Sequence, residues 1–130
     1  MKEEKGFLSQ NRQKRKSKTE FNYSIVYKEN LVGAIGIRID RFRPHVGELG
    51  YFVDEKYWGK GIASEAVKLA EKIGFGKLGL KRIEIMMIKK NKASENVAAR
   101  CGYKKEGIVR KKILLNTQYH DGYLYAKVDS

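Results

Sequence analysis

Two glycines one residue apart form the strongest chemical signal in the sequence. Residues 51–53 have the composition of a short strand and residues 54–58 that of a turn, and Gly59 and Gly61 precede the apolar stripe of a helix near Ile62. The first N–H groups of a helix have no acceptor inside the helix, and the helix dipole attracts anions to that end. Because glycine lacks a Cβ, a phosphate can approach its backbone closely. The segment therefore predicts a loop that holds a cofactor with a pyrophosphate group.

The spacing of this loop can be compared with three phosphate-binding patterns. A Walker A loop ends in Gly-Lys-Ser/Thr, whereas here Lys60 lies between the glycines and Ile62 follows them. A dinucleotide-binding loop needs a third Gly or Ala where Ser64 stands. Residues 56–61, Lys-Tyr-Trp-Gly-Lys-Gly, resemble the acyl-CoA loop Gln/Arg-x-x-Gly-x-Gly/Ala of the GNAT acetyltransferases, with Lys56 in the first position. Taken alone, the segment is better explained as an ordinary turn at the start of a helix.

A second segment supports the same family. Residues 91–103, Asn-Lys-Ala-Ser-Glu-Asn-Val-Ala-Ala-Arg-Cys-Gly-Tyr, resemble the GNAT signature Asn-x-x-Ser/Ala, a short helix and then Gly-Phe/Tyr. Gly102 fits the left-handed position just past the end of a helix. This segment alone also favours an ordinary capped helix. Both segments occur in the expected order, separated by the length of one helix and one strand, and together they indicate the family.

Further matches are closest to the ribosomal-protein-alanine N-acetyltransferase branch of that superfamily. They are Gly47-Glu48-Leu49-Gly50-Tyr51, residues 57–66, Asn91-x-x-Ser94, Lys105-Glu106-Gly107 and His120-Asp121-x-Tyr123-Leu124-Tyr125, and they span about residues 21 to 128. The branch also includes acetyltransferases for polyamines and drugs. The resemblance therefore implies acetyl-CoA as the donor and a primary amine as the acceptor, for example a protein N-terminal (ribosomal protein) amino group.

The resemblance also implies which residues hold the cofactor. The backbone of residues 56–63 would bind the diphosphate, and the edge of strand 51–53 would pair with the pantetheine amides as an added strand does. A backbone N–H near Phe52 or Val53 is the expected oxyanion donor. The expected cofactor-binding residues are Phe52, Val53, Lys56, Trp58, Gly59, Lys60, Gly61, Ile62, Ala63, Asn91 and Arg100. Solvated charge is an equally good interpretation of the lysines and the arginine, and a core anchor is the alternative for Trp58.

Two residues are candidates for moving protons. Glu48 lies on the strand that leads into the loop and could accept the proton of the amine; a surface ion pair with a lysine is the alternative. Many GNAT enzymes use a tyrosine seven residues after the asparagine, but that position is Ala98 here. In the protein N-acetyltransferase branch a serine lies near the sulfur, and Ser94 matches it; helix capping is its alternative. Tyr51 and Tyr123 are further candidate donors.

The elements that must position these residues follow from periodicity and turn residues. The predicted elements are strands over 21–27, 31–39, 48–53 and 82–88, helices that begin near 62 and 94, and a final hairpin over 103–115 and 119–128. This β-β-β-α-β-α-β-β order predicts an α/β fold of the α+β type, with a mixed, mostly antiparallel sheet flanked by helices. Residues 21–130 form the predicted GNAT domain, and residues 1–20 a polar basic tail, linker or helix end.

The family usually begins with a strand and two helices that frame the acceptor pocket, and this chain has at most the end of that region. Two expectations follow. Either the protein is a CoA-binding fragment without acceptor activity, or a neighbouring chain completes the site, which favours a homodimer. The remaining alternative is a basic RNA- or ribosome-binding adaptor on the same fold, because the formal net charge is +13. A lysine-rich solvated surface explains that charge equally well.

The length and composition of the chain limit the kinds of protein that it can be. At 130 residues the chain fits one domain. No apolar run approaches the roughly 18 residues that span a bilayer, and the first residues lack a signal-peptide pattern. Cys101 is the only cysteine, and His45 and His120 are too isolated for a metal site. We therefore expect a cytoplasmic protein without a metal, without membrane partners and without an intrachain disulfide.

Overall fold

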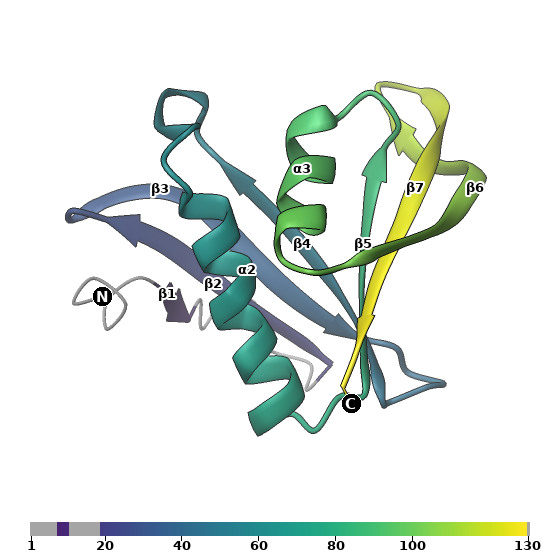
Figure 1. Ribbon diagram of the computed structural model, residues 1–130, viewed down its shortest axis with the longest axis horizontal. Coiled ribbons are helices and arrows are strands. Elements are labelled where there is room, and N and C mark those ends of the chain that lie inside the picture. Colours follow the sequence, from purple (N-terminus) through teal and green to yellow (C-terminus); the bar gives the residue numbers. More distant parts are fainter. Residues whose placement is uncertain (1–7, 11–18, 130) are drawn as a thin grey trace.

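Within the residues that the structure describes, 8–10 and 19–129, a seven-stranded sheet has the order β1-β2-β3-β4-β5-β7-β6 (Figure 1). The structure is a computed structural model. The strands are β1 Leu8–Gln10, β2 Glu20–Tyr27, β3 Asn30–Ile39, β4 Val46–Val53, β5 Arg82–Ile88, β6 Lys104–Leu115 and β7 Gln118–Val128. The helical segments are the 3₁₀ turn η2 Glu55–Tyr57, helix α2 Ile62–Lys72, the π-helical turn η3 Ile73–Lys77 and helix α3 Lys92–Arg100.

The sheet contains one parallel pair, between β4 and β5, and every other pair in the described strands is antiparallel. The parallel register runs only from Val46 opposite Arg82 to Leu49 opposite Ile85. Strand β4 continues to Val53, so its last residues have no partner on the β5 side. Figure 1 shows the two strands separating there, with α3 beside the gap.

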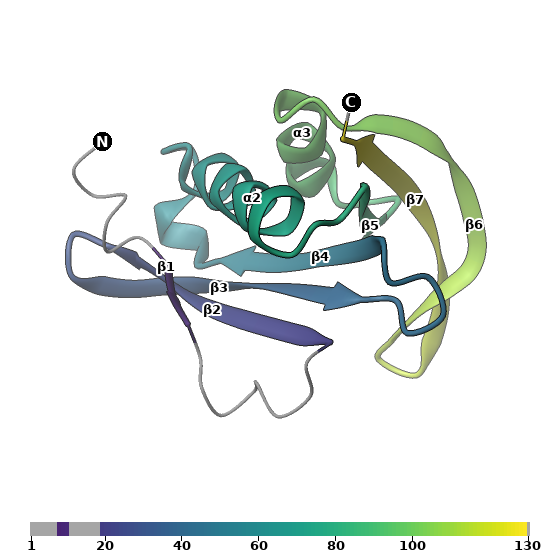
Figure 2. The same cartoon turned by 90° about the horizontal axis from the view of Figure 1, so that it is seen from below.

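Helices α2 and α3 lie on the same face of the sheet (Figure 2). Strand residues alternate between the two faces, and the apolar ones on the helix side are buried. The core between sheet and helices includes Ile25, Ile35, Ile37, Leu49, Ile62, Ala66, Val67, Ala70, Ile83 and Ile85. On α2 the buried residues recur three and four positions apart, which is the predicted stripe. No helix of the described part covers the other face of the sheet.

The predicted fold class and element order are confirmed. Both predicted hairpin turns have two consecutive left-handed residues, Lys28 and Glu29 in the first, Asn116 and Thr117 in the second, as tight hairpins with right-handed twist require. The strand β1, which pairs with the outer edge of β2, was not predicted, because three residues are too few to show a period. The rest of the predicted tail, residues 1–7 and 11–18, lies outside the described residues.

Candidate functional site

The N-terminus of α2 presents unpaired backbone donors. Gly61 is the N-cap residue with φ +77°, and its carbonyl accepts the first helical hydrogen bond from Glu65 at 3.1 Å. The N–H groups of Ile62, Ala63 and Ser64 therefore have no acceptor inside the helix, and no side chain of the described residues caps them. Such a helix end binds anions, as the glycine pattern predicted.

The two glycines are needed for their backbone conformation. Gly59 and Gly61 have φ angles of +80° and +77°, which side chains with a Cβ rarely adopt. A Cβ at either position would meet no atom within 4 Å. The space that glycine leaves open at this loop is therefore available to a ligand.

The end of β4 offers a second set of backbone groups, which have no strand partner on one side. The N–H of Asp54 donates to the carbonyl of Val32 at 2.8 Å. In an antiparallel ladder, opposed residues alternate between bonded and non-bonded pairs, so this bond and the β3–β4 register direct the N–H and C=O of Phe52 toward β3. The N–H and C=O groups of Tyr51 and Val53 point to the other side, where β5 no longer pairs with β4. That edge can accept an extended ligand.

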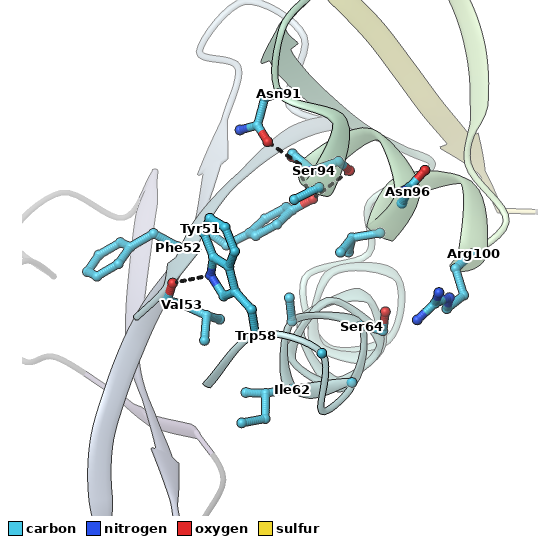
Figure 3. Close-up of a pocket in the computed structure, with 15 residues that line it drawn as sticks. Tyr51, Phe52, Val53, Trp58, Ile62, Ser64, Asn91, Ser94, Asn96 and Arg100 are labelled. Atoms are coloured by element: carbon cyan, nitrogen blue, oxygen red, sulfur yellow. Dashed lines mark hydrogen bonds between the residues drawn. The ribbon is translucent and has the colours of Figure 1, made fainter. Parts of the chain in front are cut away.

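The helix end and the strand edge line one cavity of about 310 Å³ (Figure 3). Ten of the predicted residues line it: Phe52, Val53, Trp58, Gly59, Gly61, Ile62, Ala63, Asn91, Ser94 and Arg100. The ring of Phe52 points away from α2 and α3 in Figure 3 and is 63% exposed, so this residue contributes chiefly its backbone. Arg100, at the end of α3, brings a cation to the side of the cavity next to α2.

Three predicted residues do not line this cavity: Glu48, Lys56 and Lys60. Lys56 lies in η2 and is exposed, and Lys60 is exposed between the two glycines. The two small positions of the acyl-CoA pattern also fit two residues later, at Gly61 and Ala63, where Trp58 replaces the Gln or Arg of the first position. This second alignment agrees better with the structure, because Gly61 is the N-cap and Ala63 offers one of the unpaired N–H groups.

Helix α3 positions the polar side chains on the opposite wall of the cavity. Asn91 is its N-cap, and the side-chain oxygen of Asn91 accepts from the N–H of Ser94 at 3.0 Å. At the other end Gly102, with φ +89°, donates to Ala99 at 3.1 Å, and Tyr103 donates to Ala98 at 3.0 Å. These bonds form a Schellman motif, in agreement with the position predicted for Gly102. The alternative that Ser94 caps the helix is wrong, because Asn91 does so.

Ser94 is bonded to the phenol of Tyr51. Their side-chain oxygens are 3.0 Å apart and share a hydrogen bond across the gap between β4 and α3. Burial raises the pKa of Tyr51 above its ordinary value, and the bond to Ser94 opposes this only in part. The phenol therefore keeps its proton at neutral pH. Tyr51 was considered only as a further candidate donor, and the structure places it beside the serine.

Glu48 points to the face of the sheet opposite the helices. Its carboxylate lies 3.3 Å from the guanidinium of Arg38, and both side chains are exposed. The alternative that Glu48 forms a surface ion pair is therefore confirmed, although its partner is Arg38 and not a lysine. Glu48 also lines a cavity of about 310 Å³ shared with Tyr51, Asn91 and Ser94. The gap between β4 and β5 thus connects the surroundings of Glu48 with the first cavity.

Part of the cavity wall was not predicted. Ser64, Ala93, Asn96 and Val97 also line it. On α3 the lining positions 93, 96, 97 and 100 are three or four residues apart, which is the spacing of one helix face. That spacing, counted back from the predicted residue Arg100, was the signal available in the sequence.

Two kinds of feature are absent from the described residues. They contain no group of three or more His, Cys, Asp and Glu side chains placed to hold a metal ion. None of their helices combines the length and the apolar character that crossing a bilayer requires.

Comparison with known proteins identifies the family of this site. The sequence model of the family described as "Acetyltransferase (GNAT) domain" matches residues 1–104. The chain belongs to the GNAT acetyltransferase family. The predicted resemblance is therefore confirmed, and the uncapped helix end and open strand edge belong to a GNAT domain.

Individual relatives agree with this assignment. The probable N-acetyltransferase YjcK of Bacillus subtilis is 35% identical over 99 residues, which are 75% of this chain and 55% of the relative. The ribosomal-protein-S5-alanine acetyltransferase of Vibrio fischeri is 32% identical with a TM-score of 0.79, over 85% of this chain and 62% of that one. The microcin C7 self-immunity acetyltransferase MccE, solved with acetyl-CoA and AMP, is 32% identical with a TM-score of 0.77, over 86% and 62%. The chain spans about half the length of the curated relatives it matches.

The capping role of Asn91 leads to a stability prediction. Asn91→Ala should lower the free energy of unfolding by about 0.5–2 kcal/mol, because the N–H of Ser94 loses its acceptor. Asn96→Ala in the same exposed helix is the matched control and should change stability by less than about 0.5 kcal/mol. Urea denaturation followed by circular dichroism measures both. Equal effects of the two substitutions would contradict the assigned cap.

Proposed function

We propose that the protein is an acetyl-CoA-dependent N-acetyltransferase that moves an acetyl group to a primary amine. The observation that carries the proposal is one cavity lined by both the uncapped N-terminus of α2 and the unpaired edge of β4. A helix end suits a diphosphate, and a strand edge suits a chain of amides. Coenzyme A carries both groups, and membership of the GNAT family supports the same ligand.

Different residues would bind different parts of the cofactor. The backbone of Gly59 to Ser64 would hold the diphosphate, and Arg100 would meet a phosphate charge. The backbone N–H and C=O of Tyr51 would pair with the pantetheine amides, since the C=O of Val53 already accepts from Trp58. The amide nitrogen of Asn91 would bind the same arm, since its oxygen already accepts from Ser94. When bound, acetyl-CoA supplies the acetyl thioester.

Val53 is the proposed oxyanion donor. The N–H of Phe52 bonds toward β3, whereas the N–H of Val53 points into the cavity. A fixed backbone donor stabilises the negative charge that develops on an attacked carbonyl oxygen. Of the two residues expected to supply the oxyanion donor, Phe52 and Val53, the direction of the N–H groups favours Val53.

The hydrogen-bonded pair of Tyr51 and Ser94 is the proposed acid. Ser94 lies where the resemblance places a group near the sulfur, and its hydroxyl can pass a proton to the thiolate as Tyr51 replaces it. The buried phenol keeps its proton at neutral pH, which suits a donor. Glu48, on the other side of the gap, is the proposed acceptor of the amine proton, directly or through water.

The proposed acceptor is the N-terminal amino group of a protein, such as a ribosomal protein. Support comes from the ribosomal-protein-S5-alanine acetyltransferase among the similar structures. No observation specifically favours the basic adaptor or the fragment without acceptor activity. Ribosome association, a homodimer and a cytoplasmic location stay predictions.

Cofactor binding can be tested by thermal unfolding. Acetyl-CoA at a hundredfold excess over its dissociation constant should stabilise the folded protein by about 2.7 kcal/mol. Gly61→Glu should abolish this stabilisation, because it places a carboxylate at the helix end. Gly79→Glu is the matched control, since Gly79 has a similar φ of +69° with open space around it. A stabilisation that survives Gly61→Glu, or that Gly79→Glu also removes, would contradict the placement of the diphosphate.

The acid can be tested by a double-mutant cycle. Ser94→Ala and Tyr51→Phe should each lower kcat by about 10²-fold, the lower end for general acid–base catalysis. The double variant should be little slower than the slower single variant, because the two groups act as a unit. Thiol release with a peptide acceptor measures the rates, and KM for acetyl-CoA should change less than about twofold. Strictly multiplicative effects would show that the two residues act independently.

The base can be tested by the kinetics of acetyl transfer. Glu48→Gln should lower kcat by about 10²-fold, the lower end for general acid–base catalysis, because no carboxylate remains to accept the proton. Glu84→Gln is the control, since Glu84 lies opposite Glu48 on β5 and accepts a hydrogen bond from Arg82 at 2.8 Å. A Glu48→Gln variant that keeps the wild-type kcat would remove Glu48 from the mechanism.

A further inference from the structure

The single tryptophan makes a hydrogen bond that joins the two halves of the cofactor site. The indole N–H of Trp58 donates to the carbonyl of Val53 at 2.7 Å, the dashed line beside the indole in Figure 3. Trp58 is 56% exposed and lines the cavity, so the alternative that it is a core anchor is wrong. Val53 is the last residue of β4, and Trp58 directly precedes the glycine loop.

The backbone beyond Trp58 has few restraints of its own before α2 begins. The turn η2 is closed by Tyr57 N–H to Asp54 at 2.9 Å and by Trp58 N–H to Glu55 at 3.1 Å. The ring of Tyr57 meets that of Tyr27 edge-on, with centroids 6.2 Å apart. These contacts hold the turn. After Trp58 the chain passes through two glycines, whose backbones have the widest conformational freedom.

We propose that Trp58 is a positioning residue, which fixes the diphosphate loop relative to the pantetheine edge of β4. This inference rests on the proposed binding of coenzyme A. A cofactor whose diphosphate and amides are covalently linked can use both sites only if the distance between them is correct. The bond between Trp58 and Val53 would fix that distance, because it connects the end of strand β4 to the residue that directly precedes Gly59.

The hydrogen bond between Trp58 and Val53 orders the loop before the ligand binds. A loop that is already ordered loses less conformational entropy on binding, and the gain appears as affinity. The gain applies to ligands that use the loop and the strand edge together. A ligand that uses only the strand edge gains nothing from an ordered loop. The role of Trp58 can therefore be separated from general support of the cavity by comparing two ligands.

The experiment compares coenzyme A with pantetheine, which keeps the amides but lacks the diphosphate and the nucleotide. Trp58→Phe keeps an aromatic ring and removes the N–H. It should raise the Kd for coenzyme A by about threefold to tenfold, the effect of one hydrogen bond. The Kd for pantetheine should change by less than about twofold. Tyr57→Phe, the neighbouring aromatic residue, is the control and should leave both constants unchanged. Titrations followed by NMR measure the six affinities, those of the wild-type protein and of the two variants for each ligand.

Two results would overturn the proposal: an equal loss for both ligands, or no loss for coenzyme A. If the wild-type protein binds neither ligand, the proposed function fails instead, so the two failures are distinguishable.

A measurement on the wild-type protein does not depend on the variant. Because the chain has one tryptophan, the spectrum contains one indole N–H signal from a Trp side chain. The bonded indole should exchange with solvent more slowly than that of free tryptophan, and coenzyme A should not remove this protection. Exchange as fast as in the free amino acid would overturn the proposal.

Discussion

The parallel pair of β4 and β5 ends at Leu49, although β4 continues to Val53. Backbone N–H and C=O groups away from water require partners, and beyond Leu49 the groups of β4 on this side have no strand beside them. Helices α2 and α3 flank the gap on one face of the sheet. The gap is therefore kept open by the fold, and its polar edge must be satisfied by water, by Trp58 or by a ligand.

The charge distribution adds a second constraint. The groups that face the cavity from α2 are partial positive charges on unpaired N–H groups, and Arg100 contributes a full charge. No carboxylate of the described residues lines this cavity. Many of the other cations lie on the exposed surface, including Lys56 and Lys60 beside the loop. In the proposed function the backbone would recognise the anion specifically, whereas the net charge of +13 would raise the local concentration of anionic ligands.

The sequence predicted best those features that depend on neighbouring residues. Gly59 and Gly61, the hairpin turn at Asn116 and the helix end at Gly102 each follow from local backbone requirements. The sequence did not predict that the backbone N–H of Val53, rather than that of Phe52, faces the cavity. That choice depends on the register between β3 and β4, which is set by contacts far apart in the chain.

The partners of individual side chains were harder still to predict. Ser94 and Asn91 are both good N-cap residues, and only the position at which α3 begins, Lys92, decides between them. The phenol of Tyr51 reaches Ser94 across 43 positions of sequence, and Arg38 reaches Glu48 across neighbouring strands. Composition shows that such groups exist. Strand register and helix placement decide which of these groups come into contact. Both depend on contacts throughout the fold, so they cannot be inferred from short stretches of the sequence.

In the proposed mechanism, the two faces of the sheet would allow one pair of side chains, Tyr51 and Ser94, to act on both substrates. The cofactor cavity opens on the helix face, whereas Glu48 lies on the other face, which no helix of the described part covers. Tyr51 and Ser94 line cavities on both sides of the gap. A donor held along β4 and an amine that approaches from the side of Glu48 would therefore meet beside these two residues. In the proposed mechanism, the same break in the sheet that frees the edge of β4 would also provide the passage through which the amine reaches the thioester.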